Sequence, residues 1–173
     1  MAEERKEKWL NYLSVTTVLI AVFATLSTFK GGGYSTKSLL SQSKASDEWA
    51  FYQSKSIKSY LCEMQKENLE LQLSNPTQNK ETLQKQIDLY AEKIKKYNDE
   101  KEQISKEAKG FEIVRDESKS NSERFGIAVI FLQVSILLSS ISALTKKKPL
   151  WLVSMVVGLV GFIYFLNGFI VIF

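Results

Sequence analysis

Three stretches of the sequence contain no Asp, Glu, Lys or Arg: residues 9–29, 125–144 and 150–173. The chain's 23 basic and 19 acidic side chains all lie outside them, and most fall between Lys30 and Arg124. A membrane-crossing helix needs about 20 mainly apolar residues and is penalised by a charge at its centre, whereas a helix of a soluble core keeps one polar face. The pattern predicts an all-α integral membrane protein with three transmembrane helices.

The first uncharged stretch could instead be a secretory signal peptide. Its apolar run is long, and it leads into Lys30 and Gly31 without a small-residue cleavage site. We therefore expect 9–29 to be a retained transmembrane helix. The second and third stretches are separated only by residues 145–149, a basic segment short enough to form a hairpin turn.

The distribution of lysines predicts the orientation of the chain. Short loops rich in Lys and Arg stay in the cytoplasm, and the 145–149 loop carries three lysines and no acid. Residues 1–8 should then form a cytoplasmic tail, and 30–124 should lie on the periplasmic or extracellular side. Trp9 and Trp151 stand beside the two basic segments, where interfacial anchors are expected.

The long segment 30–124 has the pattern of an antiparallel coiled-coil hairpin. Gly31–Gly33 are expected to form a flexible joint after the first span. A helix is predicted from about residue 45 to 73, and Asn75-Pro76 then interrupts it because proline disfavours helical geometry in the preceding residue. A second helix is predicted to begin near Lys80 and return to the membrane.

Each predicted arm of the hairpin carries an apolar stripe. In the second arm the spacings alternate between four and three residues, as in a left-handed coiled coil. The stripe of the first arm comprises Ala50, Ile57, Tyr60, Leu61, Met64 and Leu71; that of the second comprises Leu83, Ile87, Tyr90, Ile94, Tyr97, Lys101, Ile104, Ala108 and Phe111. We expect the two stripes to pack against each other.

The sequence lacks the residues on which most catalytic sites depend. It has no histidine, and its single cysteine, Cys62, can form neither an internal disulfide nor a thiolate cluster. The stretches 33–38 and 41–44 resemble fragments of phosphate-binding and acylation motifs, but the other elements of both motifs are missing. We therefore expect no enzymatic activity, no catalytic or metal-binding residues, no cofactor, no nucleic-acid partner and no small-molecule substrate.

Small and mildly polar residues recur inside the predicted spans. Ser135, Ser139 and Ser142 lie on one helical face, and Gly158 and Gly161 form a flat patch on the third span. Such residues usually allow membrane helices to approach closely and hydrogen-bond to one another. A polar pore lining is the alternative, but the spans supply no ionisable group to support it.

Two stretches carry a family resemblance: residues 25–36, which include Thr25-Leu26-Ser27, and residues 45–58, which include Ala45-Ser46-Asp47-Glu48-Trp49. Together they resemble a family of bacterial membrane proteins, the domain-of-unknown-function family numbered forty-three thirty-seven. The resemblance extends over nearly the whole chain. It implies a bacterial origin, and so the inner (cytoplasmic) membrane, together with a three-span layout, and it implies no activity.

These features favour a membrane-anchored coiled-coil scaffold that forms a homo-oligomer or belongs to a larger membrane complex. The aromatic side chains of the 47–58 run are expected either to pack against the returning helix near Phe111 and Val114 or to contact a subunit or partner, and small residues favour helix contacts. The candidate interaction residues are Trp49, Phe51, Tyr52, Ile57, Gly158 and Gly161. The alternative is a channel or transporter subunit, because the layout resembles that of bacterial proton-channel stator proteins. Those proteins place the helical insert in the cytoplasm, opposite to the orientation predicted here.

Overall fold

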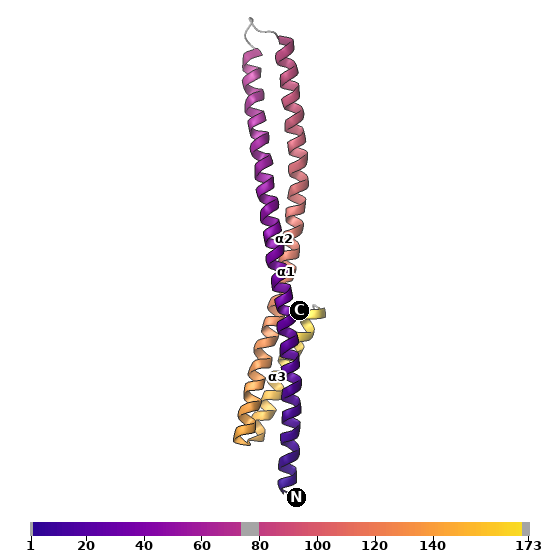
Figure 1. Ribbon diagram of the computed structural model, residues 1–173, viewed down its shortest axis with the longest axis vertical. Helices are drawn as coiled ribbons and strands as arrows, with labels where there is room; N and C mark the ends of the chain where they lie inside the picture. The colour runs from indigo at the N-terminus through magenta and orange to yellow at the C-terminus, as the bar shows by residue number, and fades with distance from the viewer. Residues whose placement is uncertain (1, 74–79, 171–173) are drawn as a thin grey trace. The chain divides into compact units, whose positions relative to one another are not determined.

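The computed structural model describes residues 2–73 and 80–170, with side chains described from Trp9 onward. These residues form three helices, α1 (Ala2–Leu73), α2 (Lys80–Thr145) and α3 (Lys148–Ile170). The first two form a long antiparallel pair (Figure 1). Each helix contains a segment long and apolar enough to cross a membrane. The predicted all-α class is therefore confirmed, and the three predicted spans are confirmed as membrane-span candidates.

Three predictions fall outside the described residues. They are the turn near 75–76, the side chains of the tail 1–8, and the last residues of the third span. The described chain divides into two compact units. Met1–Leu39 and Asp116–Phe173 form the three-helix unit, and Leu40–Arg115 form the two-helix unit. Helices α1 and α2 contribute residues to both units.

An aromatic cluster forms the core of the three-helix unit. Phe125 and Ala128 of α2 are fully buried, and Phe165 of α3 is 8% exposed. Phe23 of α1 packs against Phe165 with ring centroids 5.5 Å apart, and Phe125 meets Phe165 edge-on at 6.1 Å. Aromatic pairs in such geometries add about 0.5–1.5 kcal/mol beyond the area that they bury. The cluster joins all three helices of this unit.

The turn between α2 and α3 is shorter than the predicted basic loop. Helix α2 ends at Thr145 and α3 begins at Lys148. Lys146 has a φ of 52°, the left-handed conformation that commonly ends a helix. The Lys147 carbonyl accepts two hydrogen bonds, from the Ser142 hydroxyl at 2.9 Å and from the Leu150 N–H at 3.2 Å, which tie the turn to both helices.

The glycine joint predicted after the first span is wrong, because α1 continues through Gly31–Gly33 as regular helix. Gly31 is buried, and a Cβ atom there would lie 3.1 Å from Cβ of Phe125. The Ser122 hydroxyl donates to the Gly31 carbonyl at 3.0 Å. Gly31 therefore serves the close approach of α1 to α2, a role that offsets part of the roughly 1 kcal/mol that a helical glycine costs.

Candidate interaction surfaces

The face of α2 that packs inside the two-helix unit is the predicted one. Every residue of its stripe is buried or half-buried. The most deeply buried are Leu83, Ile87, Ile104 and Ala108, all 8% exposed or less. This confirms the prediction for the second arm, where the alternating spacing of four and three residues identified the face correctly.

The face of α1 that meets α2 is made mainly of small and polar residues. Ser41, Ala45 and Ser59 are 6%, 1% and 1% exposed. Such small side chains leave room for the large side chains that project from α2. Longer side chains of α1 on the same side are half-buried: Trp49, Tyr52, Lys55, Cys62, Lys66, Leu69 and Leu73.

Lys55 contacts side chains of both helices. Its ammonium lies 2.6 Å from the Glu100 carboxylate of α2, and it sits 5.0 Å and 5.7 Å from the ring centroids of Phe51 and Tyr97. The hydrogen bond from Lys55 lowers the pKa of Glu100 below its ordinary value, and the positive charge of Lys55 adds to this effect. The pair therefore links α1 to α2 at this point of the contact.

Further polar contacts cross between the helices. The indole N–H of Trp49 donates to Oε1 of Glu112 at 3.0 Å, and the Trp49 ring meets Tyr52 edge-on with centroids 5.5 Å apart. Further along, the Ser59 hydroxyl lies 3.1 Å from Oε1 of Glu63 on its own helix and 3.4 Å from Oδ1 of Asn98 on α2. Trp49 thus uses its hydrogen-bonding group inside the chain, as the packing interpretation of this aromatic run requires.

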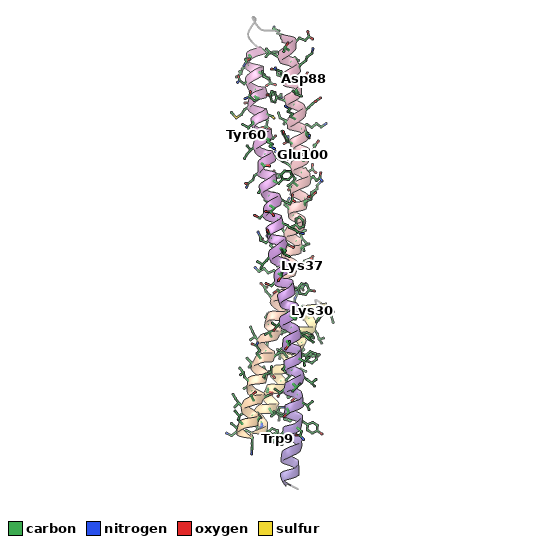
Figure 2. The ribbon with its side chains drawn as sticks, in the orientation of Figure 1. Trp9, Lys30, Lys37, Tyr60, Asp88 and Glu100 are labelled. Carbon is green, nitrogen blue, oxygen red and sulfur yellow. The ribbon has the colours of Figure 1, made fainter. Side chains whose placement is uncertain are left out.

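The predicted packing stripe of the first arm is wrong. Its six residues, which we call the outer stripe, are all exposed: Ala50, Ile57, Tyr60, Leu61, Met64 and Leu71. The last five are between 56% and 74% exposed. Figure 2 shows Tyr60 on the side of α1 away from α2. The physical reason is steric, because α2 packs on the opposite face of α1, where Ala45 and Ser59 allow a closer approach.

The four aromatic and aliphatic interaction candidates of α1 do not share one surface. Trp49 and Tyr52 are half-buried toward α2. Phe51 and Ile57 are 49% and 62% exposed. Only the second pair is open to a partner in this structure.

In the three-helix unit, the predicted serine face joins α2 to α3. Ser135 donates to the Ser154 carbonyl at 2.7 Å, and the hydroxyls of Ser139 and Ser154 are also 2.7 Å apart. All three serines are fully buried. Hydrogen bonds of this kind hold membrane helices together at about 0.6 kcal/mol each on average.

The glycines of α3 pack against α2 of the same chain. A Cβ atom at Gly158 would lie 2.8 Å from the Ser135 hydroxyl, and one at Gly161 would lie 2.9 Å from Cγ of Leu132. Both glycines are buried. They therefore provide close helix approach within the chain, and this structure does not offer them to a second copy.

Sequence reasoning missed two members of this contact, Ser154 and Gly168. Ser154 is the hydrogen-bond partner just described, and a Cβ atom at Gly168 would lie 2.7 Å from the Phe125 ring. The signal was present, since Ser154, Gly158, Gly161 and Gly168 follow a helical spacing of four, three and seven residues. One small-residue face therefore runs along most of α3.

The two tryptophans predicted as interfacial anchors lie together. The rings of Trp9 and Trp151 have centroids 6.2 Å apart, and the indole N–H of Trp151 donates to the Thr16 hydroxyl at 3.2 Å. The start of the apolar segment of α1 therefore lies beside the start of α3. Their role as interfacial anchors stays a prediction.

The sequence profile of a family described as "Domain of unknown function (DUF4337)" matches residues 9–171. The chain belongs to this family. The match spans parts of all three helices and both units, so membership applies to the whole architecture and confirms the resemblance predicted from residues 25–36 and 45–58. The chain has no match among curated proteins or among solved structures.

Proposed function

We propose that this protein is a non-enzymatic scaffold, anchored in a bacterial inner membrane, whose coiled-coil hairpin holds copies of itself or partner proteins. The observation that carries the proposal is the outer stripe of α1. Five of its side chains are large, apolar and more than half exposed on a helix rich in charged residues. An exposed apolar surface of this kind usually marks a protein interface.

The contacts of the membrane-span candidates support a scaffold over a channel or transporter subunit. A channel needs polar side chains along a pore, but Ser135 and Ser139 are engaged with Ser154 between α2 and α3. The core of this unit is an aromatic cluster around Phe125 and Phe165. Both features favour a compact anchor.

Catalysis is not part of the proposal, for the reasons that the sequence supplies. Without histidine the chain lacks the usual general base and neutral metal ligand. Cys62 is half-buried on α1. The proposed partners are the lipid bilayer and other protein chains, with no cofactor, nucleic acid or small-molecule substrate.

The proposed orientation places the N-terminus and Lys147 in the cytoplasm and the hairpin outside it. It is tested in a variant lacking Cys62, with a new cysteine at Lys80 or at Lys147. In intact spheroplasts, a membrane-impermeant thiol reagent should modify Lys80→Cys, and it should modify Lys147→Cys only after lysis. The reverse pattern would place the hairpin in the cytoplasm, as in the stator-like alternative.

The scaffold function itself is tested with two differently tagged copies of the full chain, co-expressed and extracted in mild detergent. We expect one tag to bring down the other, or each to bring down a partner in fixed stoichiometry. Mixing separately extracted copies controls for association after solubilisation. Recovery of only single copies, with no stoichiometric partner, would contradict the proposal.

A further inference from the structure

The outer stripe of α1 has the spacing of a second coiled-coil seam. Ala50, Ile57, Met64 and Leu71 recur every seven residues, and Ser54, Leu61 and Asn68 fall between them at spacings of four and three. Alternating spacings of this kind put one straight face on a helix that supercoils with a partner. The face spans residues 50–71, which is three heptads, or roughly 32 Å of helix.

This seam lies opposite the contact with α2. Tyr52, Ser59, Lys66 and Leu73 also recur every seven residues, and all four are buried or half-buried on the side of α2. They occupy the heptad position farthest from the outer seam. A helix docked on the outer stripe would therefore leave the contact between α1 and α2 undisturbed.

We propose that the outer stripe docks onto the outer stripe of a second copy, so that two α1 helices form a parallel two-stranded coiled coil. The inference rests on the proposed membrane anchoring and names the partner of that scaffold. The apolar segment of α1 precedes the outer stripe, and the same number of residues separates the two in every copy. Copies inserted in the same direction can therefore pair their stripes in parallel and in register.

The residues beside the seam are compatible with this self-pairing. In a parallel coiled coil, the residue just before one of the two core positions of each heptad, here the position of Leu61 and Asn68, lies close to a residue of the partner. That residue is five positions further along the sequence. The three flanking pairs on this seam are Gln53 with Lys58, Tyr60 with Gln65, and Glu67 with Gln72. None of these pairs brings like charges together, so two identical stripes can meet without electrostatic repulsion.

Asn68 supplies a further reason to favour two copies in register. It occupies a core position of the seam that alternates with Met64 and Leu71, and it is exposed within a single chain. A single asparagine at such a position favours a parallel dimer in which the two asparagines pair with each other. Three heptads make a short contact, but spans that confine both copies to one membrane raise their effective concentration.

Single-cysteine variants of the full chain, in a background in which Cys62→Ser removes the natural thiol, test this arrangement in native membranes. Ile57→Cys, Leu61→Cys and Asn68→Cys should each form an intermolecular disulfide on mild oxidation. Glu70→Cys and Asp88→Cys are exposed controls outside the seam and should do so severalfold less. A parallel register brings each cysteine beside its own counterpart.

An antiparallel pair would bring only the middle of the stripe together, so crosslinking at Leu61→Cys without crosslinking at Ile57→Cys and Asn68→Cys would overturn the proposal. Crosslinking of the stripe only to a different protein would overturn it too. Differently tagged copies that still co-purify without stripe crosslinks would reject this surface and leave the scaffold function standing. Separate recovery of copies without any partner would reject both.

A charge-swap experiment gives an independent test. Leu61→Glu with Met64→Glu should abolish self-association, as should Leu61→Lys with Met64→Lys, and co-expression of the two variants should restore it. Leu89→Glu with Ile113→Glu is the matched control, because both residues are apolar and exposed on α2. Helix content measured by circular dichroism should stay unchanged throughout. Self-association that survives in either stripe variant alone would overturn the proposal.

Discussion

The two units pack α1 against α2 with different chemistry. In the three-helix unit, the helices meet through aromatic rings, buried serines and glycines such as Gly31, where a Cβ atom would crowd Phe125. In the two-helix unit, a large apolar face of α2 meets a face of α1 built around Ala45 and Ser59. Both contacts contain small residues. Buried aliphatic side chains make up most of the contact only in the two-helix unit.

This difference follows the surroundings that we propose for each unit. In lipid, burial of apolar area brings little gain, so close packing and interhelical hydrogen bonds hold helices together. In water, burying the α2 stripe is favourable by about 25 cal/mol per Å². The outer stripe departs from this pattern, because its large apolar side chains remain exposed in the two-helix unit.

The largest effect should come from removing a buried side chain of the α2 stripe. Ile104 is 6% exposed, so Ile104→Ala should destabilise the two-helix unit by about 2–5 kcal/mol through lost burial and a cavity. The control Leu89→Ala removes an exposed side chain, 49% accessible, and should change stability by less than about 0.5 kcal/mol. The loss of helix on heating in mild detergent measures the change in stability of each variant. Equal effects would mean that the two faces of α2 are not distinct.

A glycine substitution tests the packing of the three-helix unit. Gly161→Leu should cost about 1–3 kcal/mol, because the new side chain meets Leu132, whose Cγ would lie 2.9 Å from the added Cβ atom. Gly126→Leu is the matched control, since a Cβ atom there meets nothing within 4 Å. Resistance of the purified protein to unfolding by sodium dodecyl sulfate reports on this contact. A Gly161→Leu variant as resistant as the control would argue against glycine-mediated approach of α2 and α3.

The smallest effect concerns pH. Because Lys55 lowers the pKa of Glu100, the folded state favours the carboxylate, and this stabilisation is present above the unfolded-state pKa of about 4.5. It is lost as the pH falls through the lower, folded-state pKa. The Glu100→Gln variant should therefore lose less thermal stability than the parent between about pH 6 and about pH 3. An identical acid-induced loss in both proteins would show that the pair does not stabilise the unit.

The span candidates and the α2 face were predictable because each depends on a pattern along one helix. A stretch without charges identifies a span regardless of its neighbours. Only one face of α2 carries a regular apolar spacing in this unit. The spacing of Ile87, Ile104 and Ala108 therefore identified the face that is buried. The family could be predicted from residues 25–36 and 45–58 because that resemblance is local.

The α1 face could not be predicted, because this helix has two faces with seven-residue periodicity. The more apolar one, with Ile57, Leu61 and Met64, was chosen on hydrophobicity, but the structure packs the face containing Ser59 against α2. Periodicity does not show which of two faces a given partner covers. For a similar reason, Gly31 was interpreted as a joint, since its contact with Phe125 depends on a residue far away in the sequence.

The central claim is that copies of this chain assemble through the face of α1 that α2 leaves open. Counting fluorophore bleaching steps in single particles of native membrane, with one label per chain, tests it most directly. We expect paired labels for the parent chain and for Leu89→Glu with Ile113→Glu, and single labels for Leu61→Glu with Met64→Glu. Single labels for the parent chain at its native expression level, or paired labels that persist in the stripe variant, would contradict the claim.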